Sequence, residues 1–171
     1  MVSVCLYFHV HQPHRLRDYH VLDIGEDDDY FDDEENKRIL QRVTKKCYLP
    51  MNNLLLDLIE QHPDRFNVSF SISGTAIEQM EEYAPEALES FQDLAATGNV
   101  EFVNETYHHS LAYLNSKEEF DKQVQRHREA LNEYFDYDPT TFRNTELIFN
   151  NELAEYVQGK GYNALLGEGA D

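Results

Sequence analysis

The sequence predicts an α/β fold in which parallel strands alternate with helices and form part of a barrel. Three observations support this. Short segments rich in β-branched and aromatic residues alternate along the chain with segments of helical periodicity. The short segments are polar on one face, whereas parallel strands of an open sheet are usually apolar on both. The chain has 171 residues, and a complete (β/α) barrel needs about 250.

The first strand is predicted over residues 2–10, where no glycine or proline interrupts the run. We expect Cys5 in this run to be a buried, reduced thiol. Residues 12–36 are predicted to be a long loop with two acidic runs. We interpret these runs as solvated surface, with a calcium-binding loop as the alternative. The strand has a polar face formed by Cys5, Tyr7, His9 and His11.

Two helices are predicted next, a first around residues 39–43 and a second over 51–59 that has Pro50 in its first turn. Two more follow the second strand, and Gly98 is the expected residue after the last of these. Ser116 and Glu119 form a capping box that begins a long helix, and Asn150 or Asn151 caps the final one. The remaining strands are predicted over 66–73, 100–105, 141–147 and 162–167.

About five parallel strands are therefore expected. A curved sheet that closes around a polar interior explains their polar faces better than an open sheet does. We expect residues 1–171 to be the N-terminal portion of a single barrel domain, with the C-terminal part missing from this chain.

The charge of the chain restricts its partners. Asp and Glu number 33 against 14 Lys and Arg, which gives a net charge of −19. Such a surface repels phosphate backbones and anionic lipids, so neither nucleic acid nor a membrane is an expected partner. No apolar stretch approaches the length of a membrane helix. The N-terminal segment lacks the basic region of a signal peptide, and we expect a cytoplasmic protein.

Imidazoles and carboxylates recur at the predicted C-terminal ends of the strands, where parallel barrels carry their active sites. Such groups are costly to bury without a purpose. The set comprises His9, His11, Ser73, Glu101, Glu105, His108, His109, Asn144, Glu146 and Glu168.

Two chemistries suit this set. In the first, one carboxylate attacks a glycosidic carbon, a second acid protonates the leaving oxygen, and histidines bind sugar hydroxyls. In the second, His9 and His11 hold a Zn²⁺ or Mn²⁺ ion together with Glu101, Glu105 or His109. We expect His108 to point outward, and His14, His20, His62 and His127 to lie at the surface without a chemical role.

Three segments of the chain resemble the signatures of glycoside hydrolase family 57. They are His9 with His11-Gln12-Pro13, the run GNVEFV at 98–103, and the run FRNTEL at 142–147. Their order and spacing also fit that family across nearly the whole chain, and the α-amylase-like branch is the most similar.

The resemblance implies a seven-stranded (β/α) barrel that acts on α-glucans or maltooligosaccharides by a retaining mechanism without a cofactor or metal. It implies that Glu146 is the nucleophile and that His9, His11 and Glu101 line the subsite of the cleaved sugar. The family's acid/base is an aspartate near a later strand, and Asp171 comes too early for that role. We therefore expect this chain alone to be inactive or nearly so. Glu105, His109, Arg143 and Asn144 complete the substrate-binding candidates.

The chain departs from the family pattern in its aromatic residues. It contains no tryptophan, and Arg143 stands where relatives often have one. Tyr7, Tyr107 and Tyr113 are the expected substitutes for stacking against a sugar. Two alternative functions stay open, a metal-dependent polysaccharide deacetylase-like enzyme and a non-catalytic glucan-binding relative.

Overall fold

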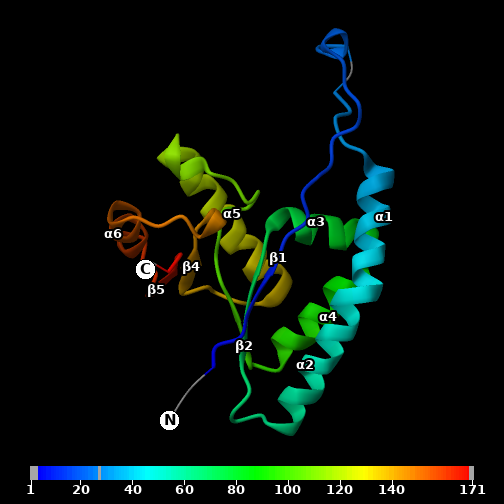
Figure 1. Cartoon of the computed structure of the whole chain (residues 1–171). Coiled ribbons are helices and arrows are strands. Elements are labelled where there is room, and N and C mark those ends of the chain that lie inside the picture. Colours follow the sequence, from blue (N-terminus) through cyan, green and yellow to red (C-terminus); the bar gives the residue numbers. More distant parts are fainter. Residues whose placement is uncertain (1–3, 27, 170–171) are drawn as a thin grey trace.

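The computed structural model describes residues 4–26 and 28–169, and Figure 1 shows a row of strands flanked by helices. The start of the predicted first strand and Asp171 lie outside the described residues. The strands are β1 (Tyr7–Val10), β2 (Val68–Ile72), β3 (Val100–Phe102), β4 (Thr141–Arg143) and β5 (Ala164–Leu166). The helices are α1 (Asp33–Val43), α2 (Leu49–Gln61), α3 (Gly74–Tyr83), α4 (Pro85–Ala96), α5 (Lys117–Phe135) and α6 (Asn151–Gly159).

The strand pairs of the described chain are all parallel, as predicted. β1 pairs with β2, β2 with β3, and β4 with β5. A single parallel bridge between Asn104 and Phe142 connects the β3 side to β4, so the strand order follows the sequence. The strands are shorter than predicted: β1 and β2 begin later, β3 and β4 end earlier, and β5 is trimmed at both ends.

The two faces of the first three strands differ in the predicted way. Phe8, Phe70 and Phe102 are in register on one face and stack, with ring centroids 5.2 and 6.5 Å apart. On the other face, His9 is in register with Ser71. This alternation directs the polar side chains of the first three strands to the same side of the sheet.

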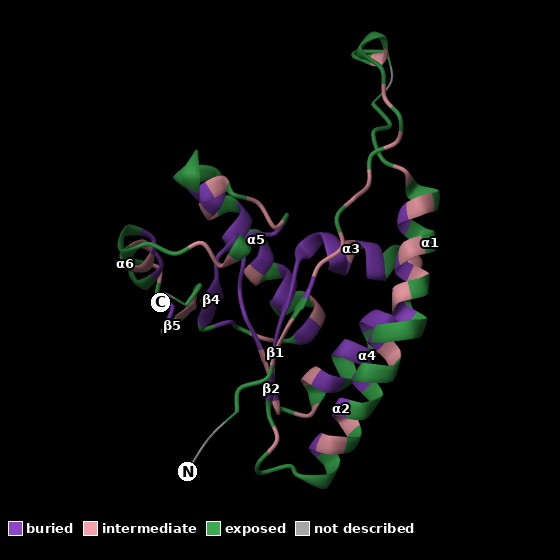
Figure 2. Ribbon diagram, in the orientation of Figure 1, coloured by how far each residue is buried: buried purple, intermediate pink, exposed green. Residues whose placement is uncertain are grey.

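The apolar core consists of two clusters, one for each group of strands. The larger contains Phe70, Phe91 and Phe102, and the smaller contains Phe120, Phe142 and Leu153. Helix α5 contributes to both, through Leu131 and Phe135 to the first and through Phe120 and Val124 to the second. Figure 2 shows β2 and β4 largely buried and the buried faces of the helices turned inward.

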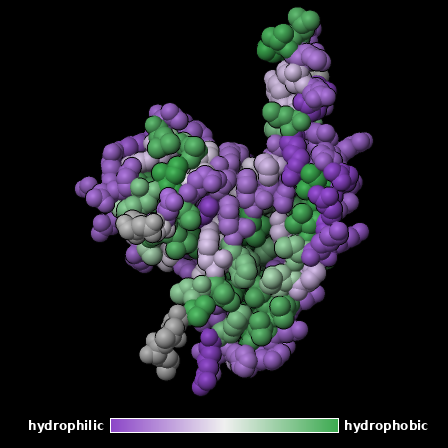
Figure 3. All heavy atoms as spheres, viewed as in Figure 1, coloured by the Kyte–Doolittle hydropathy of each residue, from purple (hydrophilic) through white to green (hydrophobic). Residues whose placement is uncertain are grey.

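The region predicted to be a loop over 12–36 is a projecting arm, residues 12–32, followed by the start of α1. Its two sides pair through an antiparallel bridge between Leu16 and Phe31. The acidic residues Asp33–Glu35 form the first turn of α1, where the helix dipole favours negative charge, and the Asp32 side chain caps that turn. Figure 3 shows apolar side chains at the tip of the arm, where Val21, Leu22 and Ile24 are exposed.

The helix ends follow the predicted caps. The side chains of Ser116 and Asn150 accept hydrogen bonds from backbone N–H groups in the first turns of α5 and α6. Gly98, which follows α4, has a φ of +73°. The first two helices, however, are joined by a π-helical turn over Thr44–Tyr48 rather than by a break.

Two predictions about burial are wrong. Cys5 is exposed, because it precedes the paired part of β1. His127 is fully buried in α5, where its Nε2 donates to the carbonyl of Ile72 over 2.7 Å and its Nδ1 accepts from the N–H of Glu105 over 3.2 Å. In the described part of the chain, no helix has the length and apolar character needed to cross a bilayer.

Candidate active site

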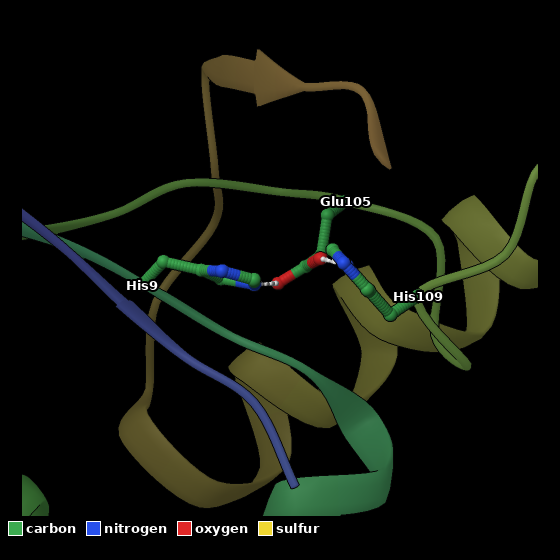
Figure 4. A group of neighbouring side chains, drawn as sticks. All are labelled: His9, Glu105 and His109. Atoms are coloured by element: carbon green, nitrogen blue, oxygen red, sulfur yellow. Dashed lines mark hydrogen bonds and ion pairs between the residues drawn. The ribbon is translucent and has the colours of Figure 1, made fainter. Parts of the chain in front are cut away.

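The C-terminal ends of β1 and β4 and the loop after β3 bring charged side chains into one cluster. His9 is the second-last residue of β1, Glu105 and His109 follow β3, and Arg143 ends β4. Figure 4 shows the Glu105 carboxylate between the two imidazoles. These segments are far apart in sequence, and the parallel register brings them together as predicted.

Glu105 is the centre of the cluster and its side chain is 0% exposed. Its Oε2 accepts a hydrogen bond from Nδ1 of His109 over 3.0 Å. Its Oε1 lies 3.7 Å from Nε2 of His9. Nη1 of Arg143 lies 3.5 Å from Glu105 Oε2 and 3.4 Å from His9 Nε2. The buried carboxylate is thus surrounded by one guanidinium and two imidazoles.

Burial and neighbouring charges determine the ionisation of the site. Burial alone would raise the pKa of Glu105, but the hydrogen bond from His109 and the nearby imidazole of His9 hold this pKa well below its usual range. Glu105 is therefore a carboxylate near neutral pH. Burial and the adjacent His109 lower the pKa of His11 to about 4, so that imidazole is neutral. Its Nδ1 is hydrogen-bonded to Ser73 Oγ at 2.7 Å.

Glu146 is not part of a strand, contrary to the prediction of a strand over 141–147. β4 ends at Arg143, and residues 145–147 form a short 3₁₀ turn. Glu146 has a φ of +55° and Leu147 a φ of +57°, which places both in the left-handed region. The turn directs the Glu146 side chain, which is 70% exposed, toward His109 Nε2 at 3.2 Å from its Oε1.

Two of the predicted site residues lie outside the cluster. Glu101 is level with Tyr7 and Ser69, two residues before the level of His9. Its carboxylate accepts from Ser69 Oγ over 2.8 Å and from Thr141 Oγ1 over 2.5 Å, so it connects three strands. Asn144 is buried and donates to the carbonyl of Ile148 over 3.0 Å, which closes the turn that carries Glu146.

Two of the tyrosines expected to replace tryptophan do not offer a free ring. Tyr107 and Tyr113 are 6% and 9% exposed, and each packs against neighbouring helices. Tyr7 is different, because its ring is half-buried and only its hydroxyl is held, by Ser71 at 2.6 Å. His108 is exposed and points away from the cluster toward Arg126, as predicted.

The sequence interpretation missed His127, which supports the cluster from behind by holding the backbone of Glu105. A signal for it was present. Val124, His127 and Leu131 lie at helical spacing on one face, so His127 belongs to the inward side of α5.

The group could be read as a metal site by spacing alone. Donor atoms of His9, Glu105 and His109 all lie within 4.8 Å of one another. However, the Arg143 guanidinium is already in contact with His9 and Glu105 and supplies the positive charge there. A metal ion would have to displace it against charge repulsion. We therefore interpret the cluster as a hydrogen-bonded network and not as a set of metal ligands.

Known proteins share both the sequence and the fold of this chain. Residues 5–171 match the family described as glycosyl hydrolase family 57. A Methanocaldococcus jannaschii protein named "Putative alpha-amylase" is 40% identical over an alignment of 170 residues that covers 96% of this chain and 35% of that protein. The chain thus spans about a third of this curated relative.

Solved structures agree at the level of the fold. The 4-alpha-glucanotransferase of Thermococcus litoralis superposes with a TM-score of 0.71 at 19% identity, over 94% of this chain and 22% of that one. The alpha-amylase AmyC of Thermotoga maritima gives 0.65 at 16% identity, over 96% and 39%. The α/β architecture with parallel strands is therefore similar to the N-terminal portion of these enzymes, and the chain belongs to glycosyl hydrolase family 57.

Proposed function

We propose that residues 1–171 are the N-terminal portion of the catalytic domain of a retaining enzyme that hydrolyses or transfers α-glucans. The domain would be a seven-stranded (β/α) barrel, of which this chain supplies the first five strands. Family membership and the α-amylase and glucanotransferase relatives support the substrate class.

The observation that carries the proposal is the contrast between Glu146 and its support. The Glu146 carboxylate is 70% exposed at the ends of the strands, while the Glu105 and His109 side chains behind it are 0% and 10% exposed. An exposed carboxylate that is held by buried, hydrogen-bonded side chains is accessible to a substrate and fixed in position. A nucleophile needs both properties.

In this mechanism, the Glu146 carboxylate attacks the anomeric carbon and forms a covalent glycosyl-enzyme ester while the C–O bond to the leaving sugar breaks. The leaving oxygen takes its proton from an aspartate outside this chain. Water or a second sugar hydroxyl then attacks the anomeric carbon, gives its proton to the same aspartate, and releases Glu146 as a carboxylate. We propose that His9 and His11 bind hydroxyls of the reacting sugar, and that the buried Arg143, which contacts His9 and Glu105, holds His9 in place. We do not extend this role to Glu101 and Asn144, since their side chains are engaged in structural hydrogen bonds.

A substitution tests the role of Glu146 in the protein that carries this chain. Glu146→Gln should lower turnover of soluble starch and maltooligosaccharides by roughly 10³-fold or more, because the amide cannot form the ester. Glu152→Gln is a matched control. Glu152 lies in α6 and its side chain is 71% exposed. It pairs with Lys117 of α5, away from the cluster. Near-normal turnover in Glu146→Gln would remove this residue from the mechanism.

Chemical rescue distinguishes a nucleophile from a residue that only supports the fold. With α-maltosyl fluoride as substrate, fluoride leaves without an acid, and azide can enter the space that Glu146→Ala opens. We expect rescue by azide and formation of β-maltosyl azide, in which a C–N bond replaces the C–F bond. Glucan binding without turnover in the unaltered protein would instead identify a non-catalytic relative. Stoichiometric metal in the purified protein would support the deacetylase-like alternative.

A further inference from the structure

His109 has a carboxylate at each of its ring nitrogens. Nδ1 lies 3.0 Å from Glu105 Oε2, and Nε2 lies 3.2 Å from Glu146 Oε1. The exposed fraction of the three side chains rises in order, from 0% for Glu105 through 10% for His109 to 70% for Glu146. The imidazole therefore connects a fully buried carboxylate to an exposed one.

The donor and acceptor atoms determine how many protons the two contacts of His109, with Glu105 and with Glu146, require. An ionised carboxylate accepts hydrogen bonds and donates none. Glu105 is ionised, so Nδ1 of His109 must carry the proton in the contact between them. The contact between Nε2 and Glu146 also needs one proton, which resides on either the ring or the carboxyl. A carboxylate that attacks carbon must be ionised, which places this proton on Nε2.

The backbone fixes both ends of the second contact. His109 has a φ of +53° and Glu146 a φ of +55°, a left-handed conformation that is strained for residues other than glycine. The two turns are connected by the buried hydroxyls of Thr106 and Thr145, 3.0 Å apart. Such geometry persists only where the surrounding structure enforces it, and here it aligns the imidazole with the carboxylate.

The other groups facing His109 do not compete as acceptors of its protons. His9 and His11 of β1 lie with their rings 4.8 and 4.4 Å from the His109 ring. Arg143 of β4 approaches from the Glu105 side, and His127 of α5 lies behind Glu105. In the part of the chain that the structure describes, the carboxylates that contact the His109 ring are Glu105 and Glu146.

We propose that Glu105 and His109 are a positioning pair for Glu146 rather than contacts to the substrate. Glu105 holds the ring with its Nδ1–H toward the interior. The Nε2–H then donates to Glu146, which orients this carboxylate and keeps it in the ionised form. The inference rests on the proposed role of Glu146 as the nucleophile. It assigns His109 the function of orienting Glu146, in place of contact with the sugar.

The test is the protonation of the His109 ring, observed by NMR in the ¹⁵N-labelled chain near neutral pH. His109→Gln assigns the ring signals by their loss. His108→Gln is the matched control, since that neighbouring imidazole is exposed and points away. We expect protons on both ring nitrogens of His109 in the unaltered chain. Glu146→Ala changes an exposed side chain and removes the acceptor of the Nε2–H. The Nε2–H signal should then disappear through exchange with water, while the Nδ1–H signal stays.

The outcomes separate this inference from the proposed function. An unprotonated Nε2 in the unaltered chain, or ring signals that Glu146→Ala leaves unchanged, would overturn the positioning pair even if azide rescue identifies Glu146 as the nucleophile. Conversely, a Nε2–H that depends on Glu146 supports the pair even if turnover turns out to use another residue. Glu105→Gln should also shift the Nδ1 signal, but the Glu146→Ala comparison decides, because Glu105 is buried and its replacement can unfold the chain.

Discussion

The neutral imidazole of His11 makes the stability of the fold depend on pH. Its pKa is about 4 in the folded chain because burial and His109 disfavour the charged ring, whereas an exposed histidine has a pKa near 6.5. Between these two values the unfolded state binds more protons than the folded state. The free energy of unfolding should therefore fall as the pH is lowered through this window. Burial lowers the pKa of His127 as well, which acts in the same direction.

Urea unfolding at several pH values between about 7 and 4 measures this effect. His11→Gln should make the free energy of unfolding less dependent on pH, because one of the groups that resists protonation is gone. His62→Gln is the control, since His62 is exposed after α2. An identical pH dependence in His11→Gln and the unaltered chain would show that His11 titrates normally in the fold.

The residues of the site show which properties can be read from sequence. His9, His11, Glu105 and His109 were predicted to converge, because strand alternation and parallel order determine on which side and at which end a residue lies. The left-handed turn of Glu146 was not predicted. It depends on a local hydrogen bond from Asn144 to Ile148 and on a long-range one between Thr145 and Thr106, 39 residues away in sequence, which no local pattern indicates.

At the scale of single elements, α3 is positioned by its first residue. A Cβ on Gly74 would lie 2.4 Å from ring atoms of Tyr107, so the helix approaches that ring more closely than any other residue would permit. Tyr107 in turn donates to Glu78 over 2.8 Å and precedes His108 and His109 in the site loop. The packing of α3 therefore controls the position of the His109 loop.

Gly74→Ala should accordingly lower the free energy of unfolding by about 1–3 kcal/mol, because the added methyl group forces Tyr107 to move. Gly159→Ala is the control, since a Cβ there meets no atom within 4 Å. Chemical denaturation measures both variants. A Gly74→Ala chain as stable as the control would mean that Tyr107 relaxes without cost.

Helices were predicted better than strand lengths, and for a physical reason. Caps such as Ser116 and Asn150 act within one turn, so the local sequence contains the information. The π-helical turn that joins α1 and α2 has no such signal, because every residue of 44–48 is compatible with a helix. The spacing of His127 in α5 indicates that it faces inward, whereas its hydrogen bond to Ile72, 55 residues away in sequence, has no local signal.

At the scale of the whole molecule, the fold consists of two parts whose strands are joined by a single parallel bridge. β1, β2 and β3 pair extensively and share the larger apolar cluster, while β4, β5 and α6 share the smaller one. Between them, the backbone hydrogen bonds run from Asn104 to Thr141 and Arg143, over 2.9 and 2.8 Å. Helix α5 packs across both clusters.

Hydrogen exchange should resolve these two parts. Amides of β4, β5 and α6 are expected to exchange faster than those of β2 and α3, because the smaller cluster buries less apolar surface. Peptide-resolved exchange measured by mass spectrometry checks this directly. Uniform protection across all five strands would show that the two parts open together.

The same dividing line passes between His109 and Glu146, since one follows β3 and the other follows β4. Any transient separation of the two halves breaks their contact before either half loses its own structure. Warming should thus break the contact between His109 and Glu146 at temperatures where the helices are still intact. A ligand that contacts both parts should hold them together and preserve this contact.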